Sequence, residues 1–140
     1  MNIENLITLA TYLEQLPADY SHFHMRTFYH KNGFAGYRYP CNAPTIPDCG
    51  TIACAIGHGP AAGLPAEDRE GWMSYSKRVF DVYCYEWDWC FSADWQTVDN
   101  THLGAAKRIR HLIEFGLPDD ARAQQWGCAD YLFNEEVQPV

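Results

Sequence analysis

The sequence predicts an α+β fold: one compact, mainly helical domain over residues 1–140 with a small two- or three-stranded antiparallel sheet. The chain has 140 residues, the usual size of one domain, and 47% hydrophobic residues to build a core. Several segments have helical periodicity, and two of these carry clear capping residues. Two other short segments alternate along the chain, which is typical of half-buried strands.

The first predicted helix spans residues 3–16. Asn2 can cap its start, Glu4 suits its first turn, and Pro17 ends it. Its apolar residues recur at helical spacing and are Leu6, Leu9, Ala10, Leu13 and Leu16. This stripe requires a packing partner elsewhere in the domain.

The sheet is expected from residues 20–30 and 82–88. Polar and apolar side chains alternate between His22 and Arg26. In the second segment, the alternating aromatic residues are Tyr83, Tyr85, Trp87, Trp89 and Phe91. Trp87 and Phe91 are also four residues apart, so a helical turn stays open as an alternative.

Four more helices are predicted, at residues 50–58, 66–80, 101–115 and 119–126. The helix at residues 101–115 has the clearest signals, because Thr101 is a good N-cap and Gly116 with Pro118 ends the helix. Its basic face, with Lys107, Arg108, Arg110 and His111, is expected to be solvated. We expect the chain to fray from about residue 134.

Charge favours a protein partner over nucleic acid. The net charge is −8, and residues 64–100 hold eight acidic and three basic side chains. Nucleic-acid binding needs a basic stripe, whereas an acidic surface complements a basic protein. The predicted partner-binding residues are Glu86, Trp87, Asp88, Trp89, Asp94 and Trp95. Alternatively, these aromatic residues fill the core and the acids face water.

The start of the chain does not have the pattern of a signal peptide, since it lacks a basic region and a small-residue cleavage site. No apolar run approaches a membrane span. We therefore expect a cytoplasmic protein, of a bacterium or a phage-infected host. Its six cysteines are expected to be reduced thiols or metal ligands.

Residues 41–58 contain a possible zinc site. Cys41, Cys49, Cys54 and His58 have the spacing C-x7-C-x4-C-x3-H, and three thiolates with one imidazole can close a tetrahedral site. The favoured interpretation of CGTIACAIGH is a buried, close-packed helix, because Gly50, Cys54, Gly57 and Ala61 share one small-residue face. No cofactor is expected on that interpretation, with zinc as the alternative.

A cysteine-dependent hydrolase is the weakest alternative. Cys49 stands where a loop meets a predicted helix, and a helix N-terminus lowers the pKa of a thiol. The base would be His102, with His58 and His111 as alternatives, and the orienting acid would be Asp99. Asp48 opposes thiolate formation by like-charge repulsion, so a non-enzymatic protein is favoured.

Three blocks, CGTIACAIGH, FSADW and DNTHLGAAKRIRHLIEFGLP, resemble a group of small uncharacterised proteins from bacteria and their phages. Members have a Cys-Gly-Thr-x-x-Cys segment and a Thr-capped helix with an Ala-Ala-x-Arg-Ile core. The resemblance covers roughly residues 1–118. It implies no particular activity, but many small phage proteins bind and inhibit a host factor, so it implies an accessory protein that modulates a host protein.

Overall fold

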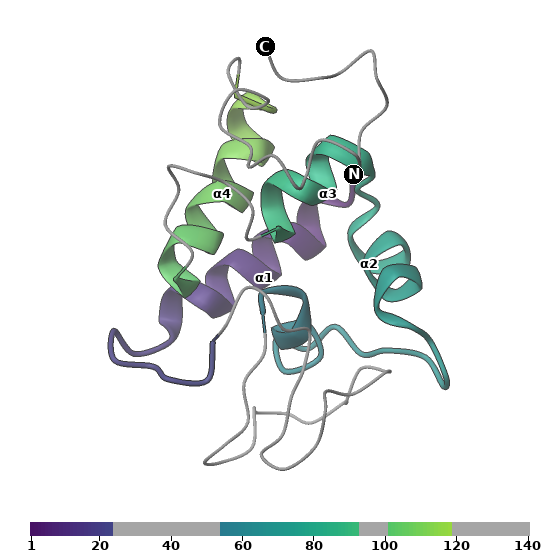
Figure 1. Cartoon of the computed structure of the whole chain (residues 1–140), viewed down its shortest axis with the longest axis horizontal. Helices are drawn as coiled ribbons and strands as arrows, with labels where there is room; N and C mark the ends of the chain where they lie inside the picture. Colours follow the sequence, from purple (N-terminus) through teal and green to yellow (C-terminus); the bar gives the residue numbers. More distant parts are fainter. Residues whose placement is uncertain (24–53, 93–100, 119–140) are drawn as a thin grey trace.

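The computed structural model describes residues 1–23, 54–92 and 101–118. These ranges form α1 (Ile3–Gln15), η1 (Ile56–His58, one turn of 3-10 helix), α2 (Trp72–Phe80), α3 (Cys84–Phe91) and α4 (His102–Phe115). Helix α4 makes its most extensive contacts with α1, α3 packs on α4, and α2 packs on α1 (Figure 1). The result is a small helical cluster with η1 beneath α1 in this view.

The capping residues place α1 and α4 as the sequence predicts. Asn2 accepts a hydrogen bond from the backbone N–H of Asn5 at 3.0 Å, which starts α1. Thr101 accepts one from the N–H of Gly104 at 3.2 Å, which starts α4. Gly116 ends α4 with φ of 77°, a conformation that favours glycine. Local signals therefore fix both ends of the helix pair that forms the centre of the fold.

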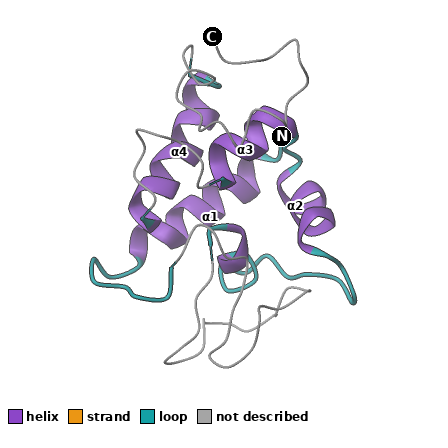
Figure 2. Cartoon of the chain, viewed as in Figure 1, coloured by secondary structure: helices purple, strands orange, loops and turns teal. Residues whose placement is uncertain are grey.

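The predicted sheet is wrong. Apart from an isolated bridge at Phe23, residues 1–23, 54–92 and 101–118 form helices, turns and loops, without a strand (Figure 2). Residues 20–23 are a connecting segment, and residues 24–30 lie outside the described ranges. The second predicted strand, residues 82–88, largely coincides with α3, where Trp87 and Phe91 pack with ring centroids 5.9 Å apart. The helical alternative at this position is therefore confirmed.

Two other predicted helices are shorter than expected. Within the described part of residues 50–58, only η1 is helical, although every residue from Cys54 to Pro60 is buried. The segment is thus a buried turn rather than a full helix. Helix α2 begins at Trp72 instead of residue 66, after turns in residues 61–69. The predicted helix 119–126 and the fraying from residue 134 lie outside the described ranges.

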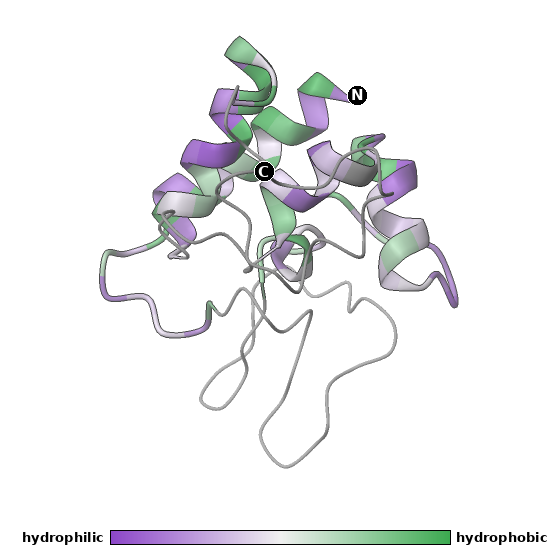
Figure 3. Cartoon of the chain, turned by 45° about the horizontal axis from the view of Figure 1, so that its top comes forward, coloured by the Kyte–Doolittle hydropathy of each residue, from purple (hydrophilic) through white to green (hydrophobic). Residues whose placement is uncertain are grey.

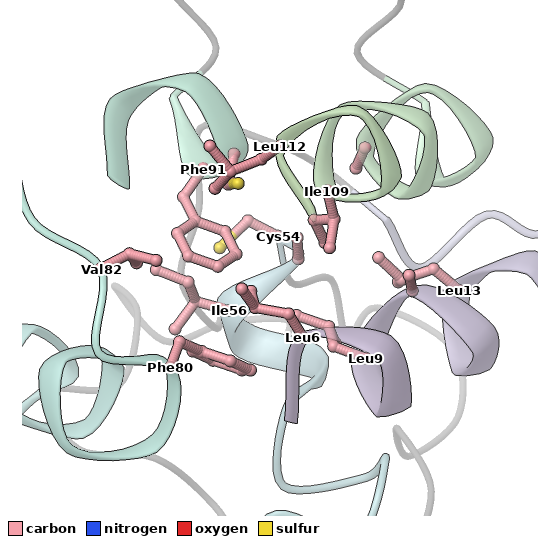
Figure 4. Close-up of a cluster of buried hydrophobic side chains, with 14 of the residues drawn as sticks. Leu6, Leu9, Leu13, Cys54, Ile56, Phe80, Val82, Phe91, Ile109 and Leu112 are labelled. Carbon is pink, nitrogen blue, oxygen red and sulfur yellow. The ribbon is translucent and has the colours of Figure 1, made fainter. Parts of the chain in front are cut away.

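One apolar core joins all these elements. Leu6, Leu9 and Leu13 of α1 meet Ile109 and Leu112 of α4. The remaining labelled members are Cys54, Ile56, Phe80, Val82 and Phe91 (Figure 4). The tip of the loop before α2 is strongly hydrophilic, in contrast to the apolar stretches of α1 (Figure 3). Within the described ranges, the structure contains no helix long and apolar enough to cross a membrane.

Candidate functional site

The predicted partner-binding residues of α3 divide into buried and half-buried ones. Asp88 is 2% exposed and Trp89 is 5% exposed, so neither is available to a partner in this conformation. The indole Nε1 of Trp89 donates to the carbonyl of Arg108 at 3.0 Å, and Nη1 of Arg108 donates back to the carbonyl of Trp89 at 3.3 Å. This reciprocal contact joins α3 to α4. Trp89 therefore has a structural role.

Trp87 and Glu86 are half-buried. The indole Nε1 of Trp87 donates to Oγ of Ser76 in α2 at 3.0 Å, and its ring packs on Phe91. Trp87 thus joins α3 to α2 much as Trp89 joins it to α4. The other two predicted residues, Asp94 and Trp95, lie outside the described ranges.

Burial also changes the interpretation of the basic face of α4. Arg108 is only 3% exposed, and its Nη1 donates to the carbonyl of Ser92 at 2.8 Å. Arg110 forms an ion pair with Glu14 of α1 at 2.9 Å and donates to Thr11. The prediction of a solvated face is wrong at Arg108, because this side chain reaches inward to backbone carbonyls at the end of α3. Lys107 is exposed as expected.

An exposed acidic and aromatic surface is present at the start of α3. We call Met1, Asp81, Tyr83 and Glu86 the Tyr83 patch. Tyr83 is 50% exposed and precedes α3, while Asp81 ends α2 in the left-handed conformation, with φ of 51°. The Met1 amine lies 2.9 Å from the carboxylate of Asp81. The hydrogen bond from the Met1 amine has the largest effect in lowering the pKa of Asp81, and the hydrogen bond from Tyr83 has the next largest. The Asp81 carboxylate in turn raises the pKa of Tyr83.

The zinc hypothesis gains no support from the residues that the structure describes. Cys41 and Cys49 lie outside them, and Cys54 and His58 are both buried. Both ring nitrogens of His58 already have hydrogen-bond partners, the carbonyl of Cys54 at 2.7 Å and the hydroxyl of Tyr20 at 2.8 Å. Burial raises the pKa of the Cys54 thiol to about 11, which disfavours the thiolate that a metal needs. No group of three ligand-type side chains in the described ranges could hold a metal ion.

The hydrolase alternative likewise gains no support. Cys49 and Asp99 lie outside the described ranges. His102 is 4% exposed, and its Nδ1 contacts the carbonyl of Leu13 at 3.0 Å. Because a carbonyl can only accept, Nδ1 carries the proton and His102 joins α4 to the end of α1. The described contacts of His102 are therefore those of a packing residue.

A cluster of histidines and aromatic rings, which the sequence analysis did not predict, surrounds Tyr20. The ring centroid of Tyr20 lies 5.3 Å from His22, 5.6 Å from His58 and 5.9 Å from His102. Phe23 packs on the two buried histidines of this cluster, with its ring centroid 5.4 Å from that of His58 and 6.1 Å from that of His102. The only sequence signal was the position of His58 within an apolar, small-residue segment, because the three histidines come from distant parts of the chain.

Comparison of the chain with protein-family models, curated proteins and solved structures finds no match.

Proposed function

We propose that this protein is a non-enzymatic accessory protein, of phage or mobile-element type, that binds a basic host protein through the Tyr83 patch. The observation that carries the proposal is the half-exposed ring of Tyr83, which is hydrogen-bonded to the carboxylate of Asp81, with the half-buried Glu86 following in the first turn of α3. Tyrosine contributes a large, rigid contact area at low entropic cost, and flanking acids select basic partners. The resemblance to small phage proteins is in keeping with this role.

The patch is held in place by the fold, which supports a binding role. Asp81 caps the end of α2, its carboxylate is hydrogen-bonded to Tyr83, and the backbone N–H of Glu86 donates to the carbonyl of Tyr83 at 3.1 Å. These contacts restrict Tyr83 before any partner arrives, so less conformational entropy is lost on binding. The patch replaces the six-residue surface predicted from sequence, of which only Glu86 is retained.

Site-specific photocrosslinking in bacterial cells tests the proposal. A benzoylphenylalanine placed at Tyr83 is compared with one at Met73 of α2, which has a similar exposure, 47% against 50%. We expect a discrete crosslinked protein at position 83 only. The Glu86→Lys substitution should abolish that product, whereas Asp68→Lys, at an exposed acid in the loop before α2, should not.

The charge-reversal pair separates a specific surface from general acidity, because each variant changes the net charge by the same amount. Equal crosslinking at positions 83 and 73, no crosslink at either, or equal loss with both lysine variants would contradict the proposal. Thermal melts of the two variants check that the fold is retained.

A further inference from the structure

His58 has a defined tautomer in this structure. Its Nδ1 contacts the carbonyl of Cys54, which can only accept, so Nδ1 carries the proton. Nε2 then has a lone pair, and the hydroxyl of Tyr20 donates to it at 2.8 Å. Nε2 therefore accepts from Tyr20 while the imidazole is neutral and becomes a donor once the ring is protonated.

Burial is the largest factor that opposes protonation of His58, and it outweighs the hydrogen bond to the carbonyl of Cys54, which favours the charged form. The side chain of His58 is fully buried. Tyr12 of α1 lies 6.3 Å away between ring centroids, Tyr20 and His22 come from the segment after α1, and His102 comes from α4. On the α2 side, Tyr75 lies beside Gly59 and donates its hydroxyl to the carbonyl of Leu64. None of these neighbours, within the described ranges, is a carboxylate that could compensate a positive charge.

We propose that Tyr20 and His58 form an acid-sensitive latch that fastens residues 17–23 to the core. A proton from solvent binds Nε2 of His58, which then donates to the Tyr20 oxygen, so the Tyr20 hydroxyl proton must turn away from the imidazole. A buried imidazolium without a counter-charge is costly, so the segment moves away and lets water reach His58. Tyr20 and Phe23 then lose their ring contacts with His58 and His102.

The sign of the pH dependence follows from the folded and unfolded states. Burial, with smaller repulsion from His102 and His22, lowers the pKa of His58 from its ordinary 6.5 to about 4. Between these values the opened or unfolded chain binds a proton that the closed form does not. The latch is therefore closed above pH 6.5 and weakens as the pH falls toward 4, with a loss on the order of 100-fold in the closing equilibrium.

Urea unfolding between pH 7.5 and pH 4 tests the latch. The glutamine in His58→Gln cannot titrate. Between pH 7.5 and pH 4, the folding equilibrium constant of the wild type should therefore fall by a factor on the order of 100 larger than that of His58→Gln. The matched control is His111→Gln, because His111 also contacts a backbone carbonyl, that of Gly116 at 3.0 Å, but lies outside the cluster. This control should retain the wild-type pH dependence. Equal pH dependence of the wild type and His58→Gln would overturn the proposal.

Two measurements remain decisive if His58→Gln does not fold. Nitrogen-15 NMR of the wild-type histidine rings should show His58 protonated on Nδ1 at pH 7.5, and protonation on Nε2 would refute the latch. In Tyr20→Phe, which keeps the ring but removes the donor, the pKa of His58 should rise, so stability at pH 7.5 falls and its acid dependence becomes shallower. An unchanged acid dependence in Tyr20→Phe would count equally against the proposal.

Hydrogen exchange distinguishes a local latch from general acid unfolding. As the pH falls from 7.5 to 5, residues 17–23 should lose protection, after correction for the intrinsic rate, before the middle of α1 or α4 does. Simultaneous loss of protection in all three segments would show that acid unfolds the domain as a whole.

Discussion

Gly59 shows how closely the backbone after η1 approaches α2. A Cβ at this position would overlap the hydroxyl of Tyr75 and lie 3.0 Å from the carbonyl oxygen of Ile56. The Tyr75 hydroxyl cannot easily move, because it donates to the carbonyl of Leu64 at 2.6 Å in a fully buried site. We therefore predict that Gly59→Ala lowers the free energy of unfolding by about 1–3 kcal/mol, as measured by urea denaturation.

A double-mutant cycle identifies the clash as the cause. Tyr75→Phe removes the oxygen nearest to the added methyl group, so Gly59→Ala should cost about 1 kcal/mol less in that background. Additive costs would show that the strain arises against Ile56 or elsewhere.

Burial of single polar residues is the least predictable property of this chain. Asp88 and Trp89 stand in a run rich in aromatic and acidic residues, so both were predicted to bind a partner, with burial of the aromatic residues as the alternative. Trp89 is buried against Arg108, which lies 19 residues further along the chain and exchanges hydrogen bonds with it. No local pattern contains this pairing, because it exists only once α3 and α4 are packed together.

At the scale of elements, the cap of α4 offers a direct test. Thr101→Ala removes the acceptor of the Gly104 N–H, and we predict a loss of about 1 kcal/mol in the free energy of unfolding. The control is Thr8→Ala, which makes the same chemical change inside α1, where the hydroxyl donates to the carbonyl of Glu4. Because alanine has the higher helix propensity, this variant should stay within about 0.5 kcal/mol of the wild type. Equal losses in the two variants would argue against a capping role.

The presence of side-chain caps and of a single apolar stripe explains which helices the sequence could predict. Helices α1 and α4 each have one apolar stripe, a side-chain N-cap and a clear stop, so periodicity and capping agree. Helix α3 contacts α2 through Trp87 and α4 through Trp89, and it buries Asp88, Trp89, Cys90 and Phe91 in succession. A helix buried on several sides has no single apolar stripe. The alternation of aromatic residues in this segment therefore did not indicate a strand.

At the scale of the whole molecule, the two proposals concern separate sites. The Tyr83 patch lies near the N-terminus where α2 leads into α3, whereas the latch joins η1 to the segment after α1 at the other end of the view in Figure 1. The hydrogen bonds of the patch join Met1 and Tyr83 to Asp81, whereas those of the latch join Tyr20 and Cys54 to His58. Opening of the latch is therefore expected to leave partner binding through the Tyr83 patch intact at mildly acidic pH.

The shared core gives the last prediction. Cys54 and Cys90 belong to one cluster of buried side chains, with exposures of 2% and 0%. Burial raises the pKa of both thiols, that of Cys54 to about 11, so few thiolates form and reagents cannot reach them. Both should resist iodoacetamide at pH 8 and become labelled at the same urea concentration, which peptide mapping by mass spectrometry can measure. Labelling of one cysteine well below the unfolding midpoint of the other would mean that this core opens in parts, because a single cooperative core exposes both sulfurs together.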